Sequence, residues 1–246
     1  MCCFSQPVDY VAGTSIFARP SKGAGQYLVY SMSLKAKSDL SMILPIPTPK
    51  ASKEDVVDFI NLEKYPEFFD DMRAGFPLPH LPGRGKGDLS LKKDDAPKLK
   101  VVDVGSFVAS FVPTVKDFSR LDEQFRLPDG TWDKLPQYRD YGFAVFKLKK
   151  GEHKIHPMAF QFPRANEKKL FFPTVHIHDG KVHDRARFDH ALYCQGWDTG
   201  MKWDESPQPA SMFLKKIDET KGIVDGKAHA YRKLMVGNFK NEDVWL

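Results

Sequence analysis

The sequence has few cysteines and no long apolar run, and both shortages narrow the class of protein. Three cysteines in 246 residues are too few for a disulfide framework, and two of them are adjacent, Cys2 and Cys3. No window approaches the roughly 18 consecutive apolar residues that a membrane span needs. The start also has neither the basic nor the apolar region of a signal peptide. These absences predict a cytoplasmic protein whose thiols are free to react or to bind metal.

Charge of one sign is likewise scarce. Lysine and arginine number 37 against 32 aspartates and glutamates, a formal net charge of +5. The basic residues are spread along the chain and mixed with acidic ones, as where Lys92 and Lys93 precede Asp94 and Asp95. Such mixtures are typical of a solvated surface, so we expect neither nucleic acid nor membrane as a partner. The sequence leaves the oligomeric state open.

Alternating apolar and polar residues indicate that much of the chain forms β-strands. The pattern predicts strands over 14–18 and 26–34, and an extended edge over 40–46, where prolines follow. Further strands are predicted over 100–112, 141–149, 157–162 and 170–178. The 13% share of aromatic residues supplies material for a core.

Helices are expected to be few and peripheral. One is predicted to begin at Ser52, an N-cap candidate, with Phe59 and Ile60 on one face. Others are predicted over 66–72 and 210–219, with helical or irregular structure over 115–125 and from Ala228. Residues 76–98, rich in Pro and Gly, are predicted to form a long irregular loop. We therefore predict one α+β domain over residues 1–246, mainly antiparallel β-sheet with a few peripheral helices.

Histidines are concentrated in one part of the sequence. Six of the eight fall between His153 and His190, and Cys194 follows closely. Imidazole and thiolate bind Zn²⁺ and copper strongly, whereas Mg²⁺ and Ca²⁺ prefer oxygen ligands. The concentration predicts a site for a transition metal ion, copper or zinc, without naming a reaction.

The dipeptide Asp179-Gly180 is a signal for a two-residue hairpin, because a type I′ turn needs positive φ at both positions. Such a turn sets His176 opposite His183 and places both on one face with His178. Opposed residues have Cβ atoms about 5 Å apart, so two or three imidazoles could reach one ion. The alternative is a polar hairpin face with three solvated histidines.

His190 and Cys194 need a separate argument. By strand parity they continue the apolar face of Phe188, away from the hairpin histidines, unless a bulge or a helical turn intervenes. Asp189 is available as a hydrogen-bond acceptor that orients an imidazole. The alternative is that His190 and Cys194 are buried and inert. The pool of candidate metal ligands is Cys2, Cys3, His176, His178, His183, His190 and Cys194.

The N-terminal thiols allow a second chemistry. Removal of Met1 would make Cys2 the N-terminal residue, whose own amine can act as a base for its thiol. Cys2, followed by a strand and by Arg19, resembles the start of the cysteine branch of the N-terminal-nucleophile hydrolases. That resemblance implies a hydrolase with Cys2 as its nucleophile. The alternative is that both cysteines simply begin a buried first strand.

Several short segments occur in a fixed order over roughly residues 2–175. They are Cys2-Cys3-Phe4, Thr14 to Leu34, Leu40 to the Pro-x-Pro motif Pro45-Ile46-Pro47, Tyr138 to Leu148, His156-Pro157 and Phe172-Pro173. Together they resemble an uncharacterised bacterial family known only as a domain of unknown function. The resemblance implies an architecture with an N-terminal Cys motif and implies no activity.

Three functions follow from these observations. The first is a soluble metal-binding protein, with or without enzymatic activity, that holds copper or zinc through His and Cys. The second is a cysteine hydrolase that uses Cys2. The third is a non-catalytic binding module whose 76–98 loop contacts a partner.

Overall fold

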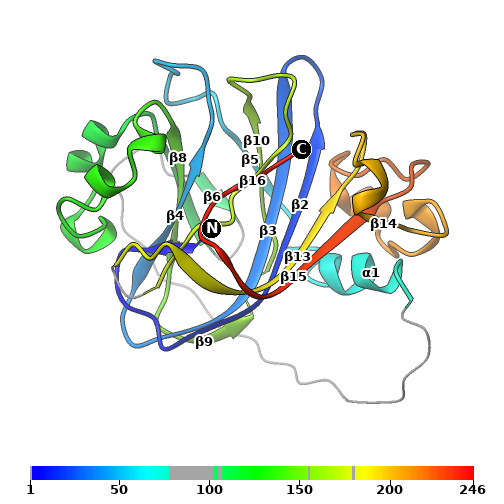
Figure 1. Ribbon diagram of the computed structural model, residues 1–246, viewed down its shortest axis with the longest axis horizontal. Helices are drawn as coiled ribbons and strands as arrows, with labels where there is room; N and C mark the ends of the chain where they lie inside the picture. The colour runs from blue at the N-terminus through cyan, green and yellow to red at the C-terminus, as the bar shows by residue number, and fades with distance from the viewer. Residues whose placement is uncertain (1, 78–101, 105–106, 155, 179–180) are drawn as a thin grey trace.

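The computed structural model describes residues 2–77, 102–104, 107–154, 156–178 and 181–246. Two large β-sheets face each other across a common core, and short helices lie on the outer sides (Figure 1). The predicted loop over 76–98 falls outside the described residues from residue 78 on, so it stays a prediction. Within the described ranges, no helix is long and apolar enough to cross a membrane.

The first sheet has six strands, and its outermost strand carries one of the histidines. In spatial order these strands are β12 (His176–Ile177), β1 (Cys2–Phe4), β4 (Leu40–Ile46), β8 (Gly142–Leu148), β7 (Phe107–Val112) and β6 (Val102–Val104). Strands β1 and β12 are parallel, and the other pairings in this sheet are antiparallel.

The second sheet has eight strands and contains the long hairpin predicted at the N-terminal end. Its main path runs through β14 (Asp204–Glu205), β15 (Tyr231–Lys240), β13 (Arg185–Cys194), β2 (Tyr10–Pro20), β3 (Gly25–Ala36), β10 (Met158–Pro163) and β5 (Asp58–Asn61), while β9 (Gly151–Lys154) pairs with β3. Strands β13 and β2 are parallel, and the others are antiparallel. A two-stranded sheet joins β11 (Phe171–Phe172) to β16 (Val244–Trp245).

Adjacent residues of the central strands point to opposite faces and therefore enter two different cores. Leu192 of β13 lies in the core between the sheets, together with Leu28 of β3 and Phe146 of β8. Tyr193 lies in a second core on the outer face of the eight-stranded sheet, together with Phe68. Each fully buried Leu or Phe side chain contributes about 1.5–3 kcal/mol to folding, so these two cores dominate the stability.

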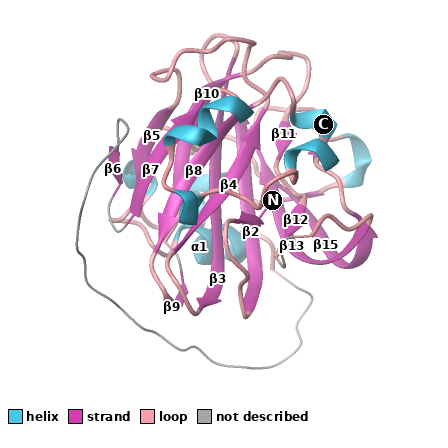
Figure 2. Cartoon of the chain, turned by 90° about the vertical axis from the view of Figure 1, so that its left-hand side faces the viewer, coloured by secondary structure: helices cyan, strands magenta, loops and turns pink. Residues whose placement is uncertain are grey.

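Only one α-helix is present among the described residues. It is α1 (Phe68–Ala74), which overlaps the helix predicted over 66–72 and covers the second core. The remaining helical segments are short 3-10 turns: η1 (Val115–Arg120), η2 (Glu123–Phe125), η3 (Trp132–Lys134), η4 (Pro136–Tyr138), η5 (Gly200–Lys202), η6 (Ala210–Met212) and η7 (Ile217–Thr220). Figure 2 shows short helices on the near face of β4 and β8. The chain is thus mostly β-strand, largely antiparallel, with few helices, as predicted; the two parallel pairings make the large sheets mixed.

Several predicted elements are wrong. The helix expected from Ser52 is absent, because Phe59 and Ile60 of β5 pack on opposite faces of the sheet, into the two different cores. The helix expected over 210–219 is replaced by two 3-10 turns, and the C-terminal segment from Tyr231 is a strand. Strand β4, predicted as an edge because of Pro45, lies between β1 and β8.

Candidate metal centre between the two sheets

Two of the predicted metal ligands meet across the interior of the molecule. His176 comes from β12 at the edge of the six-stranded sheet, and His190 comes from β13 in the eight-stranded sheet. Their Nε2 atoms lie 3.0 Å apart, at hydrogen-bonding distance. Because both rings are neutral imidazoles, the Nε2–H group of one donates a hydrogen bond to the Nε2 lone pair of the other. The pair therefore links the two layers of the fold.

Aromatic rings surround this histidine pair. The His176 ring stacks on His178, with centroids 4.9 Å apart, and on His190, at 4.7 Å. Phe188 of β13 stacks against His176 at 4.4 Å and contacts His190 at 5.1 Å. His178 in turn touches Phe4 of β1, at 5.6 Å. The two imidazoles therefore sit in a dry, aromatic setting, with the half-buried His178 beside them.

Burial keeps both members of the pair uncharged. His176 is 8% exposed and His190 is 3% exposed. Burial, with the neighbouring His190, lowers the pKa of His176 to about 2. Burial likewise lowers the pKa of His190 to about 3. At neutral pH both rings are therefore neutral, the form that binds a metal ion.

Asn241, just after β15, fixes the backbone of His176. Its side-chain oxygen accepts a hydrogen bond from the His176 amide (2.7 Å), and its side-chain nitrogen donates to the His176 carbonyl (2.9 Å). The same nitrogen donates to the His183 carbonyl at 2.9 Å. Two residues further on, the Asp243 carboxylate accepts the Thr174 amide at 2.8 Å. Sequence reasoning missed Asn241, since nothing local marks a residue 65 positions away as a neighbour of His176.

The predicted hairpin does not form as proposed. His176 pairs with Cys2 of β1, and the described strand after the turn begins only at Arg185. The turn itself, Asp179-Gly180, lies outside the described residues. His183 is exposed and lies outside any strand, so it is not opposite His176. The shared face of His176 and His178 is confirmed by the stacking of their rings.

Strand parity correctly placed His190 on the face of Phe188 and wrongly placed it away from His176. His190 does share a face with Phe188, as predicted. His176 nevertheless reaches it, because β12 belongs to the opposite sheet and approaches from across the core. Asp189 points to the other face of β13, where its carboxylate accepts the Gly13 amide at 3.0 Å, so it does not orient the ring as expected.

Of the three cysteines, only Cys2 is paired with a residue of the histidine pair. Cys194 lies four residues beyond His190 on the same strand, about 13 Å away along it, which is too far to share an ion. Burial raises the pKa of its thiol to about 12, so it stays protonated. Cys3 of β1 is buried and pairs with Ile177 of β12. Ile177 is adjacent to His176, so it points to the opposite face of the strand. The backbone of Cys2 is paired directly with His176.

The pair is the whole of the protein ligand set that can be seen. Within the ranges that the structure describes, no group of three or more His, Cys, Asp or Glu is arranged to hold a metal ion. Two imidazoles supply half of a tetrahedral coordination sphere.

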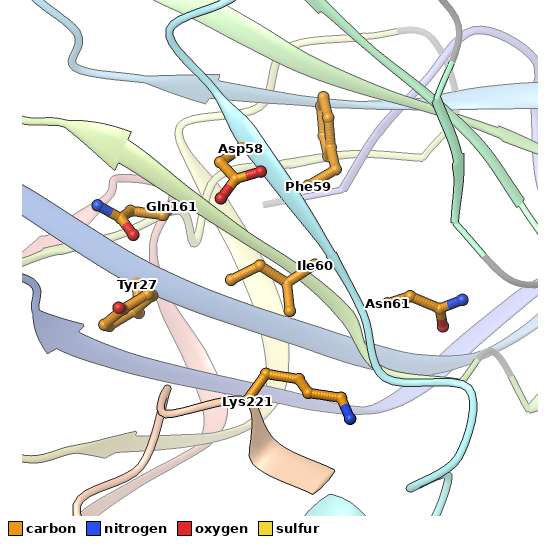
Figure 3. Close-up of a pocket in the computed structure, with 7 residues that line it drawn as sticks. All are labelled: Tyr27, Asp58, Phe59, Ile60, Asn61, Gln161 and Lys221. Atoms are coloured by element: carbon orange, nitrogen blue, oxygen red, sulfur yellow. The ribbon is translucent and has the colours of Figure 1, made fainter.

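A separate cleft of about 420 Å³ lies at the far edge of the eight-stranded sheet. Figure 3 shows Tyr27, Asp58 and Gln161 on one side of Ile60, with Lys221 below. The cleft opens on the outer face of the sheet, the face of the second core, whereas the histidine pair lies on the inner face. It contains no imidazole or thiol and has no part in the candidate metal centre.

Comparisons with known proteins give no family. No family model matches the chain, and no curated protein matches it. Among solved structures, a mutated baculovirus P35 after caspase cleavage matches with a TM-score of 0.49 and 14% identity, over 96% of this chain and 99% of that chain. P35 in a complex with caspase-8 matches with a TM-score of 0.48 and 15% identity, over 96% of this chain and 95% of that chain.

Proposed function

We propose that this protein binds a transition metal ion, Zn²⁺ or copper, between His176 and His190. The observation that carries the proposal is the 3.0 Å separation of their Nε2 atoms across the core. At metal–nitrogen distances of 2.0–2.1 Å, a tetrahedral angle sets two ligand nitrogens about 3.3 Å apart. The two nitrogen atoms are therefore about 0.3 Å closer than two ligands of one ion, and both lone pairs must also turn towards it.

The protonation state of the pair supports the same proposal. The pKa values of both rings lie far below neutrality, so neither ring carries a second proton at pH 7 that a metal ion would have to displace. The one proton shared between the Nε2 atoms must move to an Nδ1 atom, which changes the tautomer and not the charge. Imidazole donors select Zn²⁺ or copper over Mg²⁺ and Ca²⁺.

The remaining coordination positions determine what the ion does. Two protein imidazoles leave about two positions of a tetrahedral site to other ligands. If Cys2 occupies one of them, the site is more closed and becomes structural. If water occupies them, the open site can polarise a bound substrate or lower the pKa of the bound water.

Elemental analysis of the purified protein tests the proposal. After incubation with Zn²⁺ or Cu²⁺ and removal of free metal, we expect about one ion per chain in the native protein. The double variant His176→Gln/His190→Gln should lose it, because two amides can hydrogen-bond to each other but bind these ions poorly. His183→Gln is the matched control, since His183 is exposed and outside the pair, and it should retain the ion. Equal metal content in the native protein and the double variant would reject the site.

The pairing of Cys2 with His176 supports a second candidate, a hydrolase with Cys2 as nucleophile. After removal of Met1 the α-amine of Cys2 would be the base for its thiol, because burial lowers the pKa of His176 to about 2 and leaves that ring a weak proton acceptor. Mass spectrometry after treatment with iodoacetamide tests this candidate, with the buried Cys3 and Cys194 as internal controls. Selective labelling of Cys2 in protein without bound metal, unchanged in His176→Gln/His190→Gln, would favour it over the metal site.

A further inference from the structure

The outer side of β15 carries a concentration of exposed apolar side chains. Leu234 is 50% exposed and Val236 is 70% exposed on the outer face, whereas Phe239, 38% exposed, lies on the inner face beside Phe188. Elsewhere in the described chain the exposed large apolar residues, Tyr10, Met201 and Met212, are scattered over other elements. Clustered apolar exposure marks an interaction site more often than scattered exposure does.

The strand also presents an open edge. On one side β15 is paired with β13 along its whole length, from Tyr231 to Lys240. On the other side β14 covers only Tyr231 and Arg232. From Lys233 on, no described strand pairs with this second edge of β15. In an edge strand, alternate residues direct backbone N–H and C=O groups outward, so the segment is a template for another strand.

Charge around the edge indicates which strand fits. Arg185 and Arg187 of β13 are exposed on the same face as Leu234 and Val236, with the Arg185 guanidinium donating to the Asn238 carbonyl. Lys233 begins the open segment on the other face. Asp189, on the same face of β13 as the two arginines, is engaged by the Gly13 amide. Lys240 at the far end is offset by its ion pair with Glu242. The surface is therefore apolar at its centre and basic at its rim.

The same charges disfavour a second copy of this chain. Antiparallel self-pairing centred between Val236 and Gly237 sets Lys233 opposite Lys240, whose exposed ion pair with Glu242 offsets its charge only in part. Like charges placed directly opposite each other in a sheet are destabilising. An acidic partner meets no such penalty.

We propose that the open segment of β15, residues 233–240, is a docking edge for an extended peptide of a partner protein. That peptide carries apolar residues at alternate positions, which lie beside Leu234 and Val236, and acidic residues at its ends. Its backbone extends the eight-stranded sheet by one strand, and its carboxylates lie near Lys233 and the two arginines of β13.

Fluorescence anisotropy with a defined probe tests this proposal. The probe is a fluorescein-labelled octapeptide, Glu-Glu-Val-Thr-Val-Thr-Glu-Glu, added to the full chain. We expect saturable binding below about 1 mM that weakens as NaCl rises from about 50 to about 500 mM. The same peptide with lysine in place of glutamate should not bind, and N-methylation of alternate amides should abolish binding by the acidic peptide.

Two variants place the binding on the edge. Val236→Glu should weaken binding at least about tenfold, because it adds a like charge and removes the apolar contact. Met212→Glu is the matched control, since Met212 is 70% exposed but lies in η6, and it should bind as the native protein does. Circular dichroism checks that both variants are folded.

The contrary results are equally specific. Equal binding of the acidic and lysine peptides, no binding of either, or undiminished binding to Val236→Glu would overturn the proposal. A dimer in sedimentation that Val236→Glu dissociates would also overturn it, since the edge would then be occupied by a second copy.

Discussion

Acid should destabilise this protein through the histidine pair more than through any exposed histidine. His176 and His190 are both neutral in the folded state at pH 4.5 and above, whereas in the unfolded chain a histidine gains its proton near pH 6.5. The folded-state pKa values are thus depressed, and the unfolded state binds more protons below pH 6.5. The stability that the neutral pair contributes is therefore fully present above pH 6.5 and is lost progressively as pH falls toward about 3 and then about 2.

The size of the effect follows from the same pKa values. At pH 4.5, two units below the unfolded value, each histidine costs the folded state roughly 2–3 kcal/mol. The pair together costs about 5 kcal/mol, which is comparable to the whole stability of many domains. Urea unfolding of the native protein at pH 7.5 and 4.5 measures this loss.

The comparison that isolates the pair uses His176→Gln/His190→Gln. This variant lacks both titrating rings, so its loss of stability between pH 7.5 and 4.5 should be about 5 kcal/mol smaller than that of the native protein. Titration of carboxyl groups is common to both proteins and cancels in the difference. His183→Gln should behave as the native protein does. Parallel losses in the native protein and the double variant would refute the idea that a buried neutral pair exists.

Three further predictions concern the surroundings of the pair. Asn241→Ala removes two hydrogen bonds to the His176 backbone and one to His183. It should therefore lower the free energy of unfolding, measured by urea titration, by about 1–3 kcal/mol. Asn241→Asp keeps the acceptor and should lower it by less. Tyr138→Phe removes the 2.6 Å bond to Asp243 and should cost about 1–3 kcal/mol, and a change below the measurement error would mean that this bond does not hold the C-terminal segment. Cys194→Ala should leave metal content unchanged in elemental analysis, because that thiol is out of reach of the pair; loss of the ion would contradict the geometry.

The strands could be predicted where the signal is local. Residues 14–18 and 26–34 alternate on one chain segment and form the β2–β3 hairpin. The short helix α1 lies where a helix was predicted over 66–72. The C-terminal strand β15 was missed because its half-exposed edge position leaves only Met235 fully buried, so no clear period-2 pattern is present.

The histidine site was predicted in its members and not in its arrangement. Both His176 and His190 were among the candidates, but the partner expected for His176 was the nearby His183. The actual partner strand of β12 is β1, at the other end of the chain, and that pairing has no local signal. A strong turn dipeptide can suggest a hairpin, but long-range pairing with β1 overrides it.

The central claim is that an ion binds between two facing imidazoles, and anomalous diffraction from a crystal soaked in Zn²⁺ or Cu²⁺ tests it most directly. The account predicts an anomalous peak about 2.0–2.1 Å from Nε2 of both His176 and His190. A map with no peak between these atoms, while the rings keep the 3.0 Å contact they have now, would contradict it.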